Sequence, residues 1–383
     1  MISSASVRDP GSPPARPAAA IRFLANIALA FSAIALTALV LEVALRLRAR
    51  FEEVGGLGDV QARGGGALPP GSRARLGDII RVSRNPRIVY ELIPNLDVTF
   101  VNAPLITNRE GFRGPERTAE RRGPTVRLLG LGDSVMFGWG VSYENCFLAR
   151  LERLLARDFP EVSWEAVNTA VPGYNTAMEV ATLREKGLAY APDVVVVNYV
   201  GNDLGLPSFI VDPRDSLSFR SSFLVEFVRS RLALGPAEPG RRLRAVPREV
   251  RRQVLSGRME SVPPRYRELV GLDAYRRSMS ELKELSVQHA FSVVVLAQPI
   301  ANDFVKELGA ELGFPVVETE SAVEQHLAGH AGGSDPRSEL TVSAEDPHPS
   351  DLGHEIIASV LHRHLVASGL ARKLVERASR GGR

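Results

Sequence analysis

The stretch Val126-Arg-Leu-Leu-Gly-Leu-Gly-Asp-Ser134 sets the architecture of this 383-residue chain. It begins with a short apolar run, and such a run predicts a strand buried inside a sheet. Gly132 then allows the chain to leave that strand in a tight turn. Ser134 is therefore predicted at the carboxyl end of a strand, which is where open sheets of parallel strands bind their ligands.

Similar patterns recur along the chain and predict strands that alternate with helices. Apolar or β-branched runs predict four further strands, and helical spacing or a capping residue predicts the helices between and after them. The strands are expected at 164–168, 193–200, 291–297 and 314–318, and helices at 146–159, 176–190 and 351–367. This alternation predicts an α/β fold in which helices cover both faces of a parallel sheet.

One long stretch, residues 205–265, interrupts the alternation between the third and fourth strands. It is rich in Arg and Pro, contains an amphipathic piece at 223–234, and is too long for a plain crossover. Two interpretations are equally open. The insertion is either a solvated excursion with its own small packing, or a lid that shapes the substrate site.

The N-terminus carries a candidate membrane anchor. Residues 1–20 are rich in Pro, Ser and Ala and are expected to be a disordered tail. The nineteen residues from Phe23 to Leu41 contain no charge, which is just enough helix to cross a hydrocarbon core. A cleaved signal peptide and a buried helix are the alternatives, but an uncleaved transmembrane helix at 21–46 fits the length best. Arginines flank this segment on both sides, so the positive-inside rule barely discriminates between its two orientations. The orientation that we favour places the catalytic domain on the non-cytoplasmic side.

The remaining segments are assigned from their composition. Residues 47–85 contain glycine and proline clusters and are predicted to be a flexible linker. Residues 86–124 are expected to lie on the main domain as an extended lead-in. The main domain is predicted at 125–368, and a tail at 369–383.

Charge and cysteine content narrow the classes of function. The 47 basic and 44 acidic residues give a net charge of +3, which offers no argument for binding nucleic acid. Cys146 is the only cysteine, so the chain forms no intrachain disulfide. A zinc ion held by several thiolates is excluded for the same reason.

Ser134 is a candidate nucleophile that needs a partner. A serine hydroxyl attacks poorly until a nearby base takes its proton, and Gly-Asp-Ser alone is also common as a turn with a helix cap. Among seven histidines, His348 is the best candidate base, because prolines on both sides stiffen its loop just before the last helix. Asp346 and Glu345 are both close enough in sequence to orient its ring, as the acid of a triad does.

Two further positions at strand ends could hold a developing oxyanion. Gly173 follows the second predicted strand and could offer an unobstructed backbone N–H, and Asn202 follows the third and could offer its amide. Together with the N–H of Ser134 they would give three donors around one point, where acyl transfer gains most. The alternative is that Gly173 and Asn202 are ordinary turn residues.

Four short blocks follow one another along the chain, namely Gly-Asp-Ser, then Gly, then Gly-Asn-Asp, then an acid with His-Pro. Blocks in this order resemble the pattern of the SGNH/GDSL hydrolase superfamily, and the resemblance covers residues 125–368. The resemblance implies a flavodoxin-like three-layer α/β/α fold and no cofactor or metal. It also implies roles, with Ser134 as nucleophile, His348 as base, and the N–H of Ser134, Gly173 and Asn202 as the oxyanion hole. The family's usual acid lies three residues before the histidine, where Glu345 stands, but Asp346 is preferred here.

The function that follows is a serine esterase with a Ser-His-Asp mechanism. Its expected substrate is a small-molecule or glycan ester, such as an O-acetyl group on a carbohydrate or a short-chain acyl ester. Transfer of an acyl group to a cell-envelope glycan is the first alternative, because a sugar hydroxyl can replace water. A catalytically silent glycan-binding protein on the same fold is the second.

Overall fold

The computed structural model describes residues 18–51, 68–211, 222, 224, 243–299, 301–329 and 338–381. The chain divides into two compact units, one formed by residues 1–52 and 216–235 and the other by residues 53–215 and 236–383. The amphipathic piece expected at 223–234 lies outside the described residues apart from Leu224, and so does the expected disordered tail up to residue 17.

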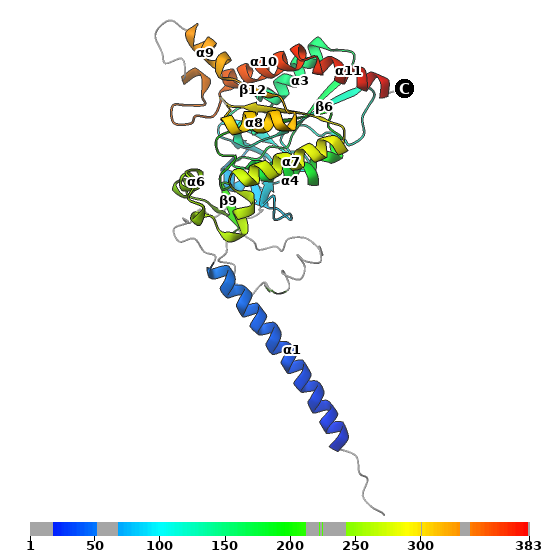
Figure 1. Cartoon of the computed structure of the whole chain (residues 1–383), viewed down its shortest axis with the longest axis vertical. Helices are drawn as coiled ribbons and strands as arrows, with labels where there is room; N and C mark the ends of the chain where they lie inside the picture. The colour runs from blue at the N-terminus through cyan, green and yellow to red at the C-terminus, as the bar shows by residue number, and fades with distance from the viewer. Residues whose placement is uncertain are drawn as a thin grey trace, which may run out of the picture. The chain divides into compact units, whose positions relative to one another are not determined.

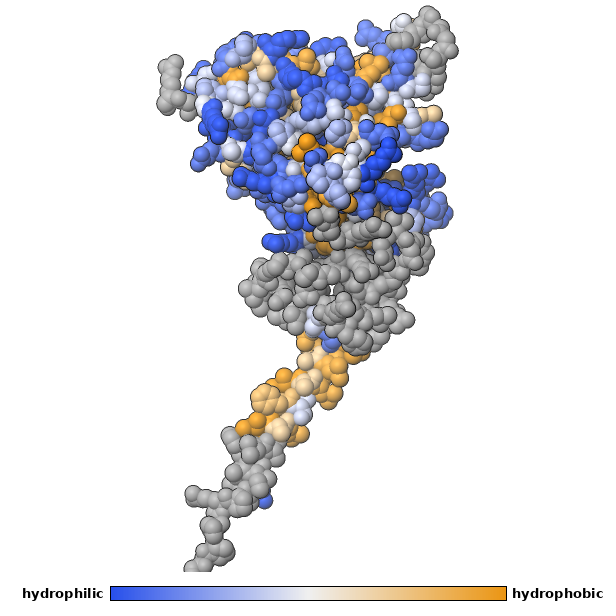
Figure 2. Space-filling view, turned by 180° about the vertical axis from the view of Figure 1, so that it is seen from behind, coloured by the Kyte–Doolittle hydropathy of each residue, from blue (hydrophilic) through white to orange (hydrophobic). Residues whose placement is uncertain are grey.

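The first unit contains the long helix α1, Ala18–Phe51. Its stretch Asn26–Leu45 is long and apolar enough to cross a membrane, although a signal sequence passes the same test. Large side chains such as Leu29 and Phe31 are each 69% exposed, and Figure 2 shows apolar residues along the visible face of this helix. Such a surface is costly in water and suits a bilayer. The helix begins three residues earlier than predicted, inside the expected tail.

The second unit is built on a five-stranded parallel sheet of order β12-β11-β8-β6-β7 (Figure 1). The strands are β6 Thr125–Leu131, β7 Ser163–Asn168, β8 Val194–Tyr199, β11 Ser292–Ala297 and β12 Val316–Glu318. All five strands were predicted, and in chain order they stand 2-1-3-4-5, the flavodoxin-like arrangement. Every residue of β6 is buried, because it lies between β7 and β8 with helices over both faces.

Helices cover both faces of this sheet, so the three-layer prediction is confirmed. Alternate residues of β6 point to opposite faces, and Leu128 and Leu129 accordingly belong to two different apolar clusters. The first cluster packs under α3, α10 and α11, and the second under α7 and α8 (Figure 1). The bounds are α3 Phe147–Asp158, α4 Thr176–Glu185, α7 Leu272–Gln288, α8 Asp303–Leu312, α9 Glu320–Ala328, α10 Asp351–Ala367 and α11 Leu370–Gly381.

The linker predicted up to residue 85 is wrong from residue 68 onward. Five short strands precede the main sheet, and they are β1 Arg73–Ala74, β2 Ile80–Val82, β3 Tyr90–Leu92, β4 Asp97–Phe100 and β5 Ala103–Ile106. Ile79 and Ile80 are fully buried in the first apolar cluster. Burial of these two side chains therefore orders a segment whose glycines and prolines suggested flexibility.

The predicted C-terminal tail is also corrected. Residues Leu370–Gly381 form α11, whose apolar face is buried and packs near β6. Ala371, Leu374 and Val375 are at most 4% exposed. These three positions follow helical spacing, which the arginine-rich sequence around them conceals.

The described part of the insertion is folded. Its elements are β9 Phe209–Val211, which pairs antiparallel with β10 Leu243–Ala245, then α6 Arg248–Leu255 and two short 3-10 helices, Met259–Ser261 and Pro264–Leu269. Phe209, Ile210 and Leu243 are buried. These residues belong to the same apolar cluster as strands β2 to β5, so this part is packed on the rest of the second unit rather than solvated throughout.

Candidate active site

Ser134 stands at the first position of the short helix α2, Ser134–Phe137, immediately after β6. Asp133 caps this helix, because its Oδ1 atom accepts a hydrogen bond of 3.0 Å from the backbone N–H of Val135. The turn is tight, since a Cβ atom at Gly132 would lie 2.5 Å from Met136. The sequence therefore brings Ser134 to the carboxyl end of β6, a buried parallel strand, as expected.

A chain of two hydrogen bonds joins Ser134 to the loop before α10. Ser134 Oγ lies 2.8 Å from His348 Nε2, although the two residues are 214 positions apart in sequence. On the other side of the ring, His348 Nδ1 lies 2.5 Å from Asp346 Oδ1. With its proton on Nδ1, the ring donates to Asp346 and is free to accept the hydroxyl proton of Ser134.

The loop that carries His348 is fixed at both ends. The backbone N–H of Val342 donates to the carbonyl of His348 at 2.8 Å, and that of Ser350 donates to the carbonyl of Leu340 at 2.9 Å. Ser350 also caps α10, since its Oγ atom accepts from the N–H of Gly353. The rigid loop expected from the two prolines is therefore anchored to a helix as well.

Of the two candidate acids, Asp346 contacts the histidine. Its Oδ1 atom accepts from both the ring and the backbone N–H of His348, and its Oδ2 atom accepts from Trp139 Nε1 at 2.8 Å. Partial burial pushes the pKa of the Asp346 carboxyl up, but the hydrogen bonds from His348 and Trp139 outweigh it and hold that pKa below its ordinary value. Glu345 is exposed and accepts a hydrogen bond from Ser343 instead.

Trp139 is a residue of this site that the sequence did not single out. Its indole ring stacks on the imidazole of His348, with ring centroids 4.8 Å apart and planes 19° from parallel. It stands between Gly138 and Gly140, whose φ angles of 85° and 79° suit glycine. An aromatic residue between two glycines just after the nucleophile is the one local signal that could have pointed to it.

Arg113 holds the loop that carries Trp139. This arginine is 3% exposed, and its guanidinium donates to the carbonyls of Phe137, Gly138 and Val141 at 2.5–2.7 Å. Those three carbonyls lie at the end of α2 and just beyond it. The lead-in segment was expected only to lie on the main domain, but it therefore supplies a buried brace for the nucleophile's own helix.

Asn202 lies beside the nucleophile. Its Nδ2 atom donates to Asp133 Oδ2 at 2.8 Å, and the same carboxylate oxygen is 3.2 Å from Ser134 Oγ. A primary amide has two N–H groups, so one remains available to a bound ligand. Asp133 thereby sets the orientation of the Asn202 amide as well as capping α2.

Gly173 lies in the loop after β7, with a φ of 78°. A Cβ atom there would lie 2.0 Å from Ser208 Oγ, so no larger side chain fits without movement. The loop reaches the nucleophile's turn through the N–H of Val171, which donates to the carbonyl of Gly132 at 3.3 Å. Gly173 is thus needed for the turn itself, in addition to any role of its N–H.

Two further buried acids lie behind the nucleophile. Asp203 accepts from Thr176 Oγ1 and from the N–H of Val200, and burial together with the charge of Asp133 raises its pKa to about 8. Glu179 is 1% exposed, and neither carboxyl oxygen has a hydrogen-bond partner among the described residues. Burial raises the pKa of Glu179 well above its usual range, with the charges of Asp203 and Asp133 adding to the effect.

The arrangement supports nucleophilic chemistry at a hydroxyl group. Among the described residues, no group of three or more His, Cys, Asp or Glu side chains could hold a metal ion. The side chains of His348 and Asp346 are 25% and 26% exposed, so both lie at the surface of the unit. An ester displayed on a larger molecule can therefore approach them.

The chain was compared with known proteins. Solved structures that resemble the chain include a variant of Axe2, an acetyl-xylooligosaccharide esterase from Geobacillus stearothermophilus. Its sequence identity to this chain is 19%, and the TM-score is 0.39. The match covers 64% of this chain and 95% of that chain. Another is LAE5, an alpha/beta hydrolase enzyme from the metagenome of Lake Arreo, Spain, with 15% identity, 66% and 98% covered, and a TM-score of 0.38. No curated protein matches the chain.

The model of the GDSL-like Lipase/Acylhydrolase family matches residues 131–356. This match begins at the end of β6, just before the nucleophile's turn, and ends within α10, so it includes Ser134, Asn202 and His348. It covers more than half of the chain, and the protein therefore belongs to the GDSL-like lipase/acylhydrolase family of serine hydrolases that act on esters.

Proposed function

We propose that the protein hydrolyses an ester in two acyl-transfer steps through Ser134, His348 and Asp346. The observation that carries this proposal is the hydrogen-bonded line from Ser134 Oγ through both ring nitrogens of His348 to Asp346. In the first step His348 takes the hydroxyl proton while Ser134 Oγ bonds to the ester carbonyl carbon. His348 then gives this proton to the leaving alcohol, and the acyl group stays on Ser134.

In the second step water takes the place of the alcohol. His348 accepts a proton from the water, whose oxygen bonds to the acyl carbon, and returns the proton to Ser134 as the carboxylic acid leaves. The oxyanion formed in each step is held by the N–H groups of Ser134 and Gly173 and by the amide of Asn202. The contact of Asn202 with Asp133, which also caps the nucleophile's helix, supports this assignment.

The proposed substrate is an O-acetyl group on a carbohydrate, or another short acyl ester. Support comes from the partial exposure of His348 and Asp346, because a base at the surface can reach an ester carried by a polymer. A bulky acyl chain would call for a deep apolar tunnel, whereas charged and polar side chains make up about half of the residues that line the described cavity beside the site.

The test is covalent labelling of the full chain in detergent with a fluorophosphonate probe. Ser134→Ala is expected to abolish labelling, and His348→Ala to slow it by about 10³-fold or more, because the hydroxyl then keeps its proton. Ser142→Ala and His289→Ala are matched controls, since neither side chain contacts the site, and both are expected to label like the parent. A folded parent that does not label would remove the proposal.

A second readout separates hydrolysis from transfer. With an acetyl ester and an oligosaccharide acceptor present together, hydrolysis releases acetate in proportion to the ester consumed. Acylated oligosaccharide formed in proportion to the ester would instead identify a transferase that uses the same three residues.

A further inference from the structure

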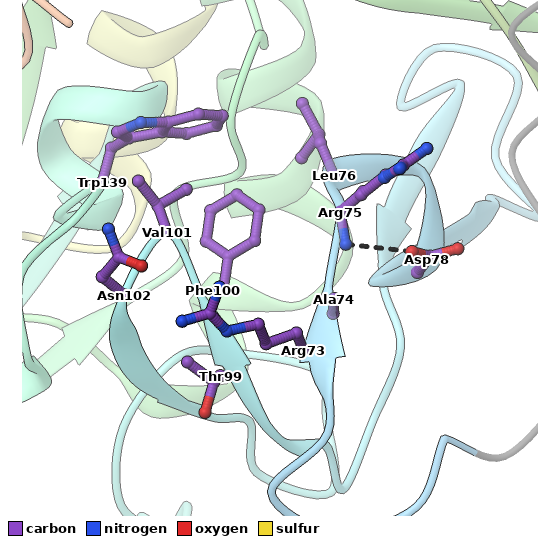
Figure 3. Close-up of a pocket in the computed structure, with 10 residues that line it drawn as sticks. All are labelled: Arg73, Ala74, Arg75, Leu76, Asp78, Thr99, Phe100, Val101, Asn102 and Trp139. Atoms are coloured by element: carbon purple, nitrogen blue, oxygen red, sulfur yellow. Dashed lines mark hydrogen bonds between the residues drawn. The ribbon is translucent and has the colours of Figure 1, made fainter.

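A cavity of about 670 Å³ lies beside the candidate active site (Figure 3). Its walls come from strands β1 and β4 with the residues beside them, and from the loop after α2. They include Arg73, Arg75, Thr99, Phe100, Asn102 and Trp139. The strands β1 and β4 pair with each other in this wall, with Arg73 beside Thr99. A cavity of this size is within the range of small-ligand sites.

Trp139 links the cavity to the catalytic residues. One indole ring lines the cavity, stacks on His348 and donates its N–H to Asp346. The ring of Phe100 meets it edge to face, with centroids 4.8 Å apart and an interplanar angle of 82°. Trp139 is thus shared between the cavity and the candidate catalytic residues.

The cavity also carries positive charge that the protein does not neutralise. Arg73 and Arg75 are exposed, and neither guanidinium forms an ion pair or a hydrogen bond with another described residue. The one carboxylate in the lining, Asp78, accepts a hydrogen bond from the backbone N–H of Arg75 and not from its side chain. By contrast Arg81, the next described arginine along the chain, pairs with Glu91 at 2.6 Å.

Figure 3 shows how the polar groups are arranged. The Arg73 side chain runs past Phe100 toward Asn102, while Arg75 extends in the opposite direction. Val101 and Asn102 form the two-residue turn between β4 and β5, with φ angles of 45° and 64°. A β-branched residue seldom adopts such a conformation, and backbone strain of this kind is concentrated at ligand sites.

We propose that this cavity binds an acidic sugar ring of the ester substrate, a proposal that rests on the ester-hydrolase function above. The aromatic rings of Phe100 and Trp139 offer apolar surface for a sugar ring. Thr99 and Asn102 offer hydrogen bonds for its hydroxyl groups, and Arg73 offers a planar cation for a carboxylate. A neutral sugar or an aliphatic chain would leave the guanidinium of Arg73 without a partner.

The experiment uses two acetylated methyl glucosides that differ only at C6, one a carboxylate and the other its carboxamide. Acetate release by the full chain in detergent is measured for the parent, Arg73→Gln and Arg75→Gln, with Arg84→Gln as control. Arg84 is an exposed arginine just after β2. It does not line the cavity and makes no ion pair with a described residue. The parent and the control are expected to prefer the carboxylate by about tenfold in kcat/KM, and Arg73→Gln to lose most of that preference.

The Arg84→Gln control should hydrolyse the carboxamide within about twofold of the parent rate, because Arg84 does not line the cavity. The preference should shrink as salt is added, since exposed charges are screened over about 10 Å at 0.1 M. Equal rates for carboxylate and carboxamide in the parent would overturn the proposal, as would an equal loss on both substrates in Arg73→Gln.

A binding measurement separates this proposal from the catalytic one. The variant Ser134→Ala is titrated with the carboxylate and with the carboxamide. Tighter binding of the carboxylate supports the subsite, provided that this preference disappears in the double variant Ser134→Ala, Arg73→Gln. If 4-nitrophenyl acetate is not hydrolysed by the parent, the esterase function fails while this titration still decides the subsite. A C6-sulfated glucoside in the same titration tells whether the cavity requires a carboxylate or accepts any sugar anion.

Discussion

Trp139 is the residue on which the most interactions of the site depend. It covers one face of the His348 ring, donates to Asp346 and forms a wall of the neighbouring cavity. The stacked ring limits the rotation of the imidazole, and the indole N–H gives the acid a second donor besides the histidine. Its role in the proposed mechanism is to position these two residues, since its indole contacts His348 and Asp346, while its backbone N–H donates to the carbonyl of Ser134 at 3.0 Å and not to Oγ.

We expect Trp139→Phe to lower kcat about tenfold and to change KM little for 4-nitrophenyl acetate. Phenylalanine keeps an aromatic ring against His348 but removes a hydrogen bond to a carboxylate, which is worth about 1.5 kcal/mol. Trp164→Phe is the matched control, because its indole donates only to the carbonyl of Phe159. A kcat equal to that of the control would show that the indole N–H is not needed.

Sequence patterns could reveal Ser134, His348 and Asp346 but not the residues that hold them. Each of the three lies in a short motif with a local reason, such as a strand end or a proline-flanked loop. Trp139 contacts a residue far along the chain, and Arg113 binds backbone carbonyl groups. Neither kind of contact produces a recognisable spacing of residue types in the sequence. Only the folded chain brings an arginine of the lead-in segment to the end of α2.

At the level of elements, α4 is unusual because eight of its ten residues are buried, including Glu179. The carboxyl of Glu179 has no described hydrogen-bond partner and lies near two other acids, Asp203 and Asp133. In the unfolded chain this group would ionise near its ordinary pKa, whereas in the folded chain it holds its proton to higher pH. The folded state therefore binds more protons in between, and its stability falls as pH rises through that window.

We expect Glu179→Gln to flatten this decline. The difference in unfolding free energy between Glu179→Gln and the parent should grow as pH rises above the ordinary pKa of a glutamic acid, by at most about 1.36 kcal/mol per pH unit, the value for a proton difference of one. Urea unfolding at four pH values measures it. The exposed variant Glu284→Gln serves as control and should run parallel to the parent, and a parallel line for Glu179→Gln as well would contradict a buried protonated carboxyl.

Elements of regular length were predicted well, and the short ones were not. The parallel strands and α10 have the apolar runs or the capping residue that local rules recognise. Strands β1 and β2 have two and three residues, too few to show a period, and glycines and prolines surround them. They are ordered by Ile79 and Ile80, whose burial depends on partners elsewhere in the chain.

For the whole molecule, α1 is the feature that would set its location. We propose that α1 remains uncleaved and anchors the chain with the hydrolase unit on the non-cytoplasmic side. Deletion of residues 1–51 is expected to move the protein from the membrane fraction to the soluble one without loss of fluorophosphonate labelling. Retention in membranes after the deletion would mean that another surface binds the bilayer.

Sidedness has its own measurement. Protease added to intact spheroplasts of a bacterial host is expected to digest the hydrolase unit, and protease added to inverted vesicles to leave it intact. The opposite pattern would place the unit in the cytoplasm, and a shortened N-terminus found by sequencing would identify a cleaved signal peptide.

Ser134 and His348 lie 214 positions apart, so the two are also separated in time during synthesis. At about 5–20 residues per second, the histidine leaves the ribosome roughly 10–40 s after the serine. During that interval β6 and Ser134 already exist, but His348, Asp346 and α10 do not. Under the proposed mechanism, a chain that is arrested or cut before residue 346 carries an unactivated hydroxyl and cleaves no ester.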